Sequence, residues 1–102
     1  MVDNAVTFSV TNNGRRPVVV QKVGGYHVTG KTREFIIANE YSEVLPARLE
    51  PYGSVHPWTE DLSIFAEPIE FVGAWDSLGR LYKCSKRDLR FVVERVRHIK
   101  TP

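Results

Sequence analysis

The sequence predicts a mainly β fold: an antiparallel β-sandwich of about seven short strands, followed by one amphipathic α-helix at the C-terminus. Apolar and polar residues alternate along several segments, which is the pattern of strands with one buried face. Turn-forming Asn, Gly and Pro residues separate these segments at short intervals. In the last segment alone, apolar residues recur three and four positions apart, which is the period of a helix.

The first predicted strand covers residues 5–11. Apolar residues at every second position alternate there with Thr and Ser, so one face of the strand is apolar. Asn-Asn-Gly at 12–14 follows, and Asn and Gly tolerate the positive φ angles of tight turns. A β-branched run begins shortly afterwards, at 18–23. We therefore predict an antiparallel hairpin between 5–11 and 18–23.

The second predicted strand bends and is followed by a turn and a third strand. Gly-Gly at 24–25 indicates a bulge or bend, beyond which the strand continues to Val28. The turn is expected at 29–31 and the third strand at 33–38. Residues 39–43 are polar and predicted to be irregular.

Prolines interrupt residues 44–58 three times, and each removes a backbone donor from a strand ladder. Loop and short edge strand are therefore expected here, not a central strand. Leu45 and Leu49 are the expected anchors of this segment in the core. A short strand is predicted from Val55 to Trp58.

The following segment combines a helical turn with a second hairpin. A hydroxyl residue and two acidic residues at 59–61 are typical of a helix start, and Pro68 limits that turn. The strand predicted at 69–75 is apolar on both faces, which indicates a central position. A turn at 76–79 leads to its expected partner strand at 80–84.

The last segment, residues 86–98, is predicted to be a helix of about three turns. Ser85 and Asp88, three residues apart, fit an N-terminal cap. The apolar face of the predicted helix consists of Leu89, Val92, Val93 and Val96. Valine lowers helix propensity, so a final β-strand is the competing prediction.

Turn residues in three places carry a resemblance. They are Asn-Gly-Arg-Arg-Pro within 10–18, Leu-Pro and Leu-Glu-Pro within 45–51, and Asp-Ser-Leu-Gly-Arg within 76–82. Together these motifs resemble uncharacterised bacterial immunoglobulin-like β-sandwich domains over residues 6–84. The chain departs from the pattern by placing Tyr52 between a Pro and a Gly. The resemblance implies an immunoglobulin-like sandwich and no catalytic residues.

Composition indicates one domain over residues 1–102. The apolar fraction of 42% and the charged fraction of 25% are ordinary for a globular protein. Cys84 is the single cysteine, which excludes an internal disulfide and a four-cysteine zinc site. The N-terminus does not resemble a signal peptide, and no apolar run is long enough to span a membrane. We therefore expect a soluble, cytoplasmic protein with no membrane association.

Reactive side chains do not form a pattern that predicts catalysis, a cofactor or a metal site. His27, His56 and His98 lie in three separate segments, whereas a zinc ion needs about four ligands at close range. Alternation places Cys84 with Tyr82 on the inward face of its hairpin, where a thiol packs as a small hydrophobic group. We therefore expect no enzyme, no metal and no cofactor.

Aromatic residues outside the central strands are the first candidate binding surface. Tyr41, Tyr52 and Trp58 fall in predicted loops or edges, where aromatic side chains offer contact area for sugars, bases or proteins. The alternative is that Tyr52 and Trp58 close one open end of the sandwich.

Basic residues near the C-terminus are the second candidate. From residue 80 onward the chain holds eight Lys or Arg residues against two acidic ones, whereas the part before it holds six against ten. Arg87, Arg90 and Arg97 share one outward stripe of the predicted helix with Glu94. A basic stripe can neutralise phosphates, although a solvated charged face is the ordinary alternative.

The expected function is a non-enzymatic binding or adaptor module. It would engage another protein, or its own copy as a homodimer, through an exposed sheet edge or the loop aromatics. One alternative is binding of nucleic acid or another anionic partner through the basic segment 80–100. Another alternative is a carbohydrate-binding module that uses Tyr52 and Trp58.

Overall fold

A computed structural model of the chain describes residues 5–28, 34–42, 44–91 and 93. The elements in these residues are β1 (Val6–Thr7), β2 (Val10–Thr11), β3 (Val18–His27), β4 (Glu34–Ala38), β5 (Ala47–Leu49), β6 (Ser54–Val55), β7 (Trp58–Thr59), the 3₁₀ turn η1 (Leu62–Phe65), β8 (Ile69–Asp76) and β9 (Leu81–Lys83). A short helix follows β9. The predicted mainly β, antiparallel character and the C-terminal helix are therefore confirmed. None of the helices in the described residues is long and apolar enough to span a membrane.

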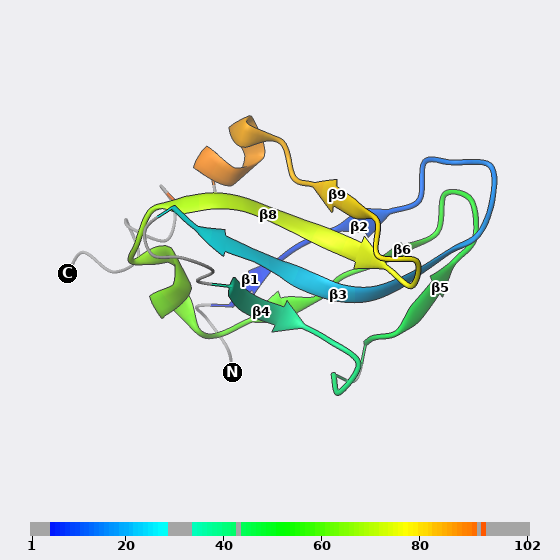
Figure 1. Ribbon diagram of the computed structural model, residues 1–102, viewed down its shortest axis with the longest axis horizontal. Helices are drawn as coiled ribbons and strands as arrows, with labels where there is room; N and C mark the ends of the chain where they lie inside the picture. The colour runs from blue at the N-terminus through cyan, green and yellow to red at the C-terminus, as the bar shows by residue number, and fades with distance from the viewer. Residues whose placement is uncertain (1–4, 29–33, 43, 92, 94–102) are drawn as a thin grey trace.

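A five-stranded antiparallel sheet forms the main body of the structure (Figure 1). The strands run in the order β4-β3-β8-β9, and β5 pairs with the first part of β3. Strand β8 lies between β3 and β9, so its predicted central position is confirmed. The hairpin predicted across 76–79 is the β8–β9 hairpin. Strand β9 ends the sheet on that side.

The predicted hairpin between 5–11 and 18–23 is wrong. Strand β1 pairs with β7 and β2 pairs with β6, while β3 belongs to the five-stranded sheet. The reason is Asn12, whose buried side-chain amide donates hydrogen bonds to the carbonyl oxygens of Arg16 and Leu49. These bonds hold residues 12–17 as an open loop that carries the chain from β2 to the other sheet.

The Gly-Gly pair of β3 allows close approach of both neighbouring strands. A Cβ atom on Gly24 would collide with the carbonyl oxygen of Phe35 in β4, and one on Gly25 with that of Phe71 in β8. The register of β3 against β4 shifts between Val23 and Gly24. The predicted irregularity is therefore confirmed, and β3 continues past it to His27.

The core lies on one face of the five-stranded sheet and has two parts. The first cluster consists of Val20, Val23, Ala38, Leu45, Leu49 and Ala74, against which Val10 and Val55 pack. The second consists of Phe35, Ile64, Phe65 and Val72, against which Val6, Phe8, Leu89 and Val93 pack. Residues of β1, β2 and β6 therefore cover this face. Leu45 and Leu49 are buried, so their predicted anchoring role is confirmed.

The opposite face of the sheet, toward the viewer in Figure 1, carries a small aromatic cluster. The rings of Tyr26 and Trp75 lie 5.1 and 6.0 Å from the ring of Phe71, measured between centroids. Lys22 Nζ lies 4.3 Å from the Trp75 ring and Lys83 Nζ lies 4.8 Å from the Phe71 ring. Cation–π contacts therefore cover these rings where no further layer of described residues does.

Both predicted helical segments are present. The 3₁₀ turn is capped by Asp61, which accepts a hydrogen bond from the Ser63 amide and lies at the end of the predicted 59–61 start. The C-terminal helix includes 86–91 and 93, and Ser85 Oγ accepts a hydrogen bond from the Asp88 amide, as the cap predicts. The competing final strand is wrong for these residues. The rest of the predicted helix, to residue 98, lies outside the described residues.

Candidate functional site

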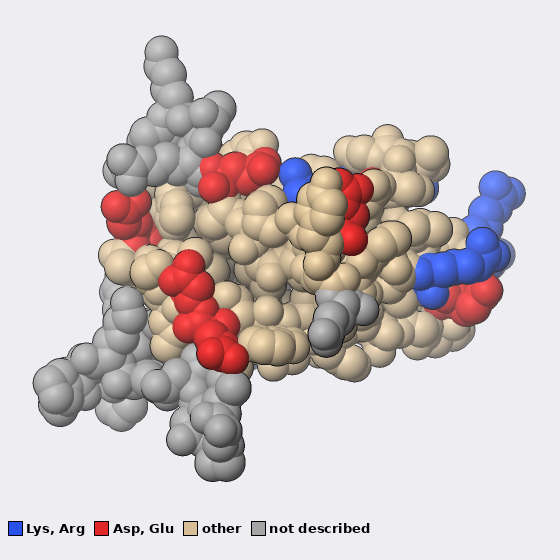
Figure 2. Space-filling model, turned by 90° about the horizontal axis from the view of Figure 1, so that it is seen from below, with Lys and Arg blue, Asp and Glu red and all other residues tan. Residues whose placement is uncertain are grey.

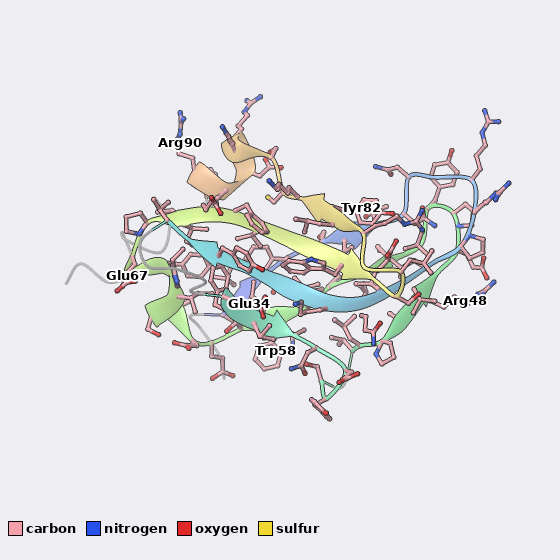
Figure 3. All side chains as sticks on the ribbon, in the orientation of Figure 1. Glu34, Arg48, Trp58, Glu67, Tyr82 and Arg90 are labelled. Carbon is pink, nitrogen blue, oxygen red and sulfur yellow. The ribbon has the colours of Figure 1, made fainter. Side chains whose placement is uncertain are left out.

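The three predicted loop aromatics are all exposed, but they do not form one surface. Tyr41 lies in the turn after β4, Tyr52 in the turn between β5 and β6, and Trp58 on β7. Trp58 projects from the lower side of the molecule in Figure 3, whereas the β5–β6 turn lies at the far right in Figure 1. The structure therefore gives these residues no common binding face.

Of the predicted basic residues, Arg87 and Arg90 are exposed on the C-terminal helix. Arg90 points away from the sheet at the upper left of Figure 3. Arg97 lies outside the described residues. The two described arginines are thus available to solvent, on a helix that packs against the core through Leu89.

A groove of about 900 Å³ lies between the 12–17 loop and the β8–β9 hairpin. Its apolar lining includes Val10, Val18, Val20, Leu49 and Ala74. Its polar lining includes Arg15, Arg16, Asp76, Arg80 and Tyr82. A mostly apolar groove with a few charged groups at its border is the usual form of a binding site. Figure 3 shows Tyr82 on the side of the groove that the hairpin supplies.

The groove is open because the described part of the C-terminal helix packs against only one of the two core clusters. Leu89 and Val93 pack against the second cluster, with Phe35 and Val72. The first cluster, which includes Ala74, has no such cover from the described residues between β2 and β9. The groove therefore exposes the side of the core that helix residues 86–91 and 93 leave uncovered.

Asp76 organises the wall of the groove. Its buried carboxylate accepts hydrogen bonds from the amides of Leu78 and Arg80, each at 2.9 Å, and from Arg80 Nε at 2.7 Å and Tyr82 Oη at 3.1 Å. Burial raises the pKa of the Asp76 carboxyl, but these hydrogen bonds outweigh burial and lower that pKa below its ordinary value. Asp76 is therefore charged at neutral pH and holds Arg80 and Tyr82 in place.

Tyr82 differs from its predicted inward position. It lies opposite Ala74, on the face of the sheet that carries the core, yet 49% of its surface is exposed. The physical reason is the position of β9 at the end of the sheet, where none of the described elements covers the ring. The alternation of apolar and polar residues therefore predicted the face of Tyr82 correctly, but its prediction that Tyr82 is buried was wrong. Cys84, on the same face, is half-buried against the second cluster.

Strand β9 has a free backbone edge beside the groove. Arg80 O accepts a hydrogen bond from the Asp76 amide, and Cys84 N donates one to Val72 O. Because alternate residues of an antiparallel strand point their backbone groups to opposite sides, Leu81 and Lys83 direct theirs away from β8. In the part of the chain that the structure describes, no strand pairs with that edge.

The histidines and the cysteine have ordinary structural environments. His27 Nε2 lies 2.7 Å from Ile64 O, and the His56 ring lies between the hydroxyls of Ser9 and Ser54. Over residues 5–28, 34–42, 44–91 and 93, no three His, Cys, Asp or Glu side chains gather in a metal-binding arrangement. Burial, with a smaller contribution from Asp88, raises the pKa of the Cys84 thiol. The thiol is therefore protonated at neutral pH, which disfavours a nucleophilic role.

Sequence reasoning missed the groove because its residues were assigned to turns. Arg15, Arg16 and Arg80 belong to the turn motifs at 12–17 and 76–80, whose Asn, Asp and Gly residues explain the local backbone. One sequence signal could have indicated the groove: the adjacent arginines Arg15 and Arg16 lie in a turn whose backbone geometry does not require charged residues. Tyr82 gave a second signal, since a large aromatic residue stands close to the end of a hairpin.

Comparisons of the chain with protein-family models, with curated proteins and with solved structures found no match. The resemblance to immunoglobulin-like sandwich domains therefore stays a prediction.

Proposed function

We propose that this protein is a non-catalytic binding module that takes up an extended segment of a partner protein at the free edge of β9. The observation that carries the proposal is the position of that edge directly beside the groove. An added strand gains backbone hydrogen bonds from the edge and side-chain contacts from the groove. The edge of β9 is thus the sheet edge at which we propose the interaction expected from the sequence.

The bound segment would extend the five-stranded sheet by one strand. Its backbone would pair with the outward-facing groups of Leu81 and Lys83. Successive side chains of a strand point to opposite faces, so every second residue would enter the groove and contact Val10, Ala74 and Tyr82. The remaining side chains would lie on the other face, beside Lys83.

Leu81→Pro tests this mode of binding. Proline removes the outward-facing amide of residue 81 and leaves the bonds between β9 and β8 in place, because those involve the neighbouring residues. Peptides selected on the unaltered protein from a random library are expected to bind Leu81→Pro about tenfold more weakly. Leu81→Ala, which keeps the amide and removes the side chain, is the control. Equal binding to the proline variant would contradict strand addition.

Nucleic-acid binding is the second candidate, because Lys86, Arg87 and Arg90 are exposed beside Lys83. Binding that depends on phosphate contacts falls steeply with salt. Retention of an oligonucleotide at low salt, lost in Arg87→Glu/Arg90→Glu, would support this candidate. Absence of retention at low salt would remove it.

We also propose that the fold is an immunoglobulin-like sandwich, as the turn motifs imply. The support is the packing of β1, β2 and β6 residues against one face of the five-stranded sheet. Carbohydrate binding through Tyr52 and Trp58 is the least supported alternative, since the two side chains lie on separate parts of the surface.

A further inference from the structure

We infer that the segment bound at β9 is short and acidic, with apolar and carboxylate side chains in alternation. This inference rests on the proposed strand addition and specifies the chemistry of the partner. It follows from three features: the charge of the groove, the charge of the β9 edge, and the elements that limit the groove at both ends.

The groove has excess positive charge. Three arginines line it, and Asp76 is the one acidic residue among its described lining residues. The Asp76 carboxylate is already satisfied by Arg80 and Tyr82. Arg15 and Arg16 are exposed and form no ion pair with a carboxylate of the described residues. Two arginines at the border of the groove therefore remain available for the carboxylates of a ligand.

The edge of β9 continues this charge. Residues 80–87 contain four basic residues and no acidic one. Figure 2 shows the molecule from below, on the side away from β9. Acidic side chains are spread over the left and centre there, while basic and acidic side chains lie together at the right-hand end. An acidic segment is therefore complementary to the basic chain around β9.

A second copy of the chain fits the same edge poorly. Antiparallel pairing of two β9 strands would bring Arg80 of each copy close to the basic residues after position 82 of the other. Like charges on paired strands are destabilising. The same pairing with an acidic segment replaces these repulsions by attractions, so the occupant we infer is a different, acidic chain.

The elements around β9 limit the length of the segment. Strand β9 has three residues, and the chain leaves the sheet at Cys84 to begin the helix. The 12–17 loop limits the other end of the groove. At about 3.3 Å per residue, an added strand of about four or five residues would fill this length. Apolar side chains would enter the groove toward Val10 and Ala74, and carboxylates on the other face of the strand would lie beside Lys83. A carboxylate at the end of the segment next to the 12–17 loop would reach the two loop arginines at the border of the groove.

Synthetic peptides test the inference directly. The probe is a fluorescein-labelled Glu-Val-Glu-Val-Glu peptide with blocked ends, compared with Gln-Val-Gln-Val-Gln and with the non-alternating Glu-Glu-Val-Val-Glu. Anisotropy titrations at about 50 and 300 mM salt give the dissociation constants. We expect the alternating acidic peptide to bind about tenfold more tightly than either comparison peptide, with the difference reduced at the higher salt.

Arginine variants locate the charge contacts. Arg15→Glu/Arg16→Glu is expected to weaken binding of the acidic peptide by about tenfold or more. The matched control is Arg48→Glu, an exposed arginine of β5 outside the groove lining, for which we expect a change of at most about twofold. An equal effect of both variants would show long-range attraction without a site and would overturn the inference.

The outcomes separate this inference from the proposed function. Equal binding of the Gln and Glu peptides, both weakened by Leu81→Pro, would overturn the acidic preference and keep strand addition. Acidic-peptide binding that Leu81→Pro leaves unchanged would overturn strand addition. A dimer in light scattering that Leu81→Pro dissociates would identify a second copy as the occupant. Tighter binding of an oligonucleotide that depends on Arg15 and Arg16 would reassign the groove to nucleic acid.

Discussion

Asp76 shows how one residue links the stability of a hairpin to the shape of a binding surface. Its carboxylate accepts hydrogen bonds from two amides of its own turn and from the side chains of Arg80 and Tyr82. The backbone bonds fix the turn, and the side-chain bonds fix the wall of the groove. A substitution at this position is therefore expected to affect folding and binding together.

Asp76→Asn is expected to lower the free energy of unfolding by roughly 2–4 kcal/mol, because buried donors lose a charged acceptor. Urea denaturation at neutral pH measures this change. Glu60→Gln, at an exposed carboxylate, is the control and should change stability by less than about 0.5 kcal/mol. Equal stability of the two variants would contradict the central role assigned to Asp76.

The pH dependence follows from the lowered pKa of Asp76. Because the pKa in the folded state lies below the ordinary value of 3.8, the charged form stabilises the fold above about pH 4. This stabilisation is lost as the pH falls through the folded-state pKa. Unfolding free energies measured from pH 6 downward should therefore decline less steeply in Asp76→Asn than in the unaltered protein.

At the scale of elements, the two glycines of β3 decide how closely the strands of the sheet approach. Both stand where the backbone carbonyl of a neighbouring strand would contact any side chain. The two neighbours are different strands, β4 on one side and β8 on the other. The pair therefore sets the spacing of β3 to both partners, and the register of β3 against β4 shifts immediately before Gly24.

Gly25→Ala is expected to destabilise the protein by about 3 kcal/mol or more, since the methyl group would collide with Phe71 O and force β3 and β8 apart. In Gly14→Ala, the nearest atom to the new methyl group is Asn12 Oδ1 at 3.2 Å, so we expect a loss of at most about 1 kcal/mol. Denaturation midpoints compare the two variants. Similar midpoints would show that β3 and β8 can separate without cost.

Elements whose signals are local could be predicted from the sequence. The β8–β9 hairpin depends on Asp76 and the turn that follows it, and the helix depends on the Ser85 cap, so neighbouring residues contain the information. The pairing of β1 with β7 and of β2 with β6 could not be predicted in this way. It depends on Asn12 reaching Leu49 O, a contact between residues 37 positions apart.

At the scale of the whole molecule, the candidate site escaped prediction because segments far apart in the sequence form it. The 12–17 loop, the strands β2, β3 and β5, and the β8–β9 hairpin each have a local explanation as turn or strand. The groove between them forms only when the chain folds. The prediction that Tyr41, Tyr52 and Trp58 are exposed was correct. It did not indicate the groove, because the exposure of single aromatic residues does not show where a concave surface forms.

The basic residues around β9 have a further consequence for solubility. A strand with an unpaired edge is a template for aggregation, and natural proteins protect such edges with charged side chains, above all lysine. Lys83 stands at this edge of the sheet and Lys86 follows it on the helix, and both can serve as gatekeepers against uncontrolled pairing of copies. The basic residues that would favour an acidic partner thus also disfavour pairing between two copies of the chain. Recognition and protection from aggregation would therefore depend on the same residues.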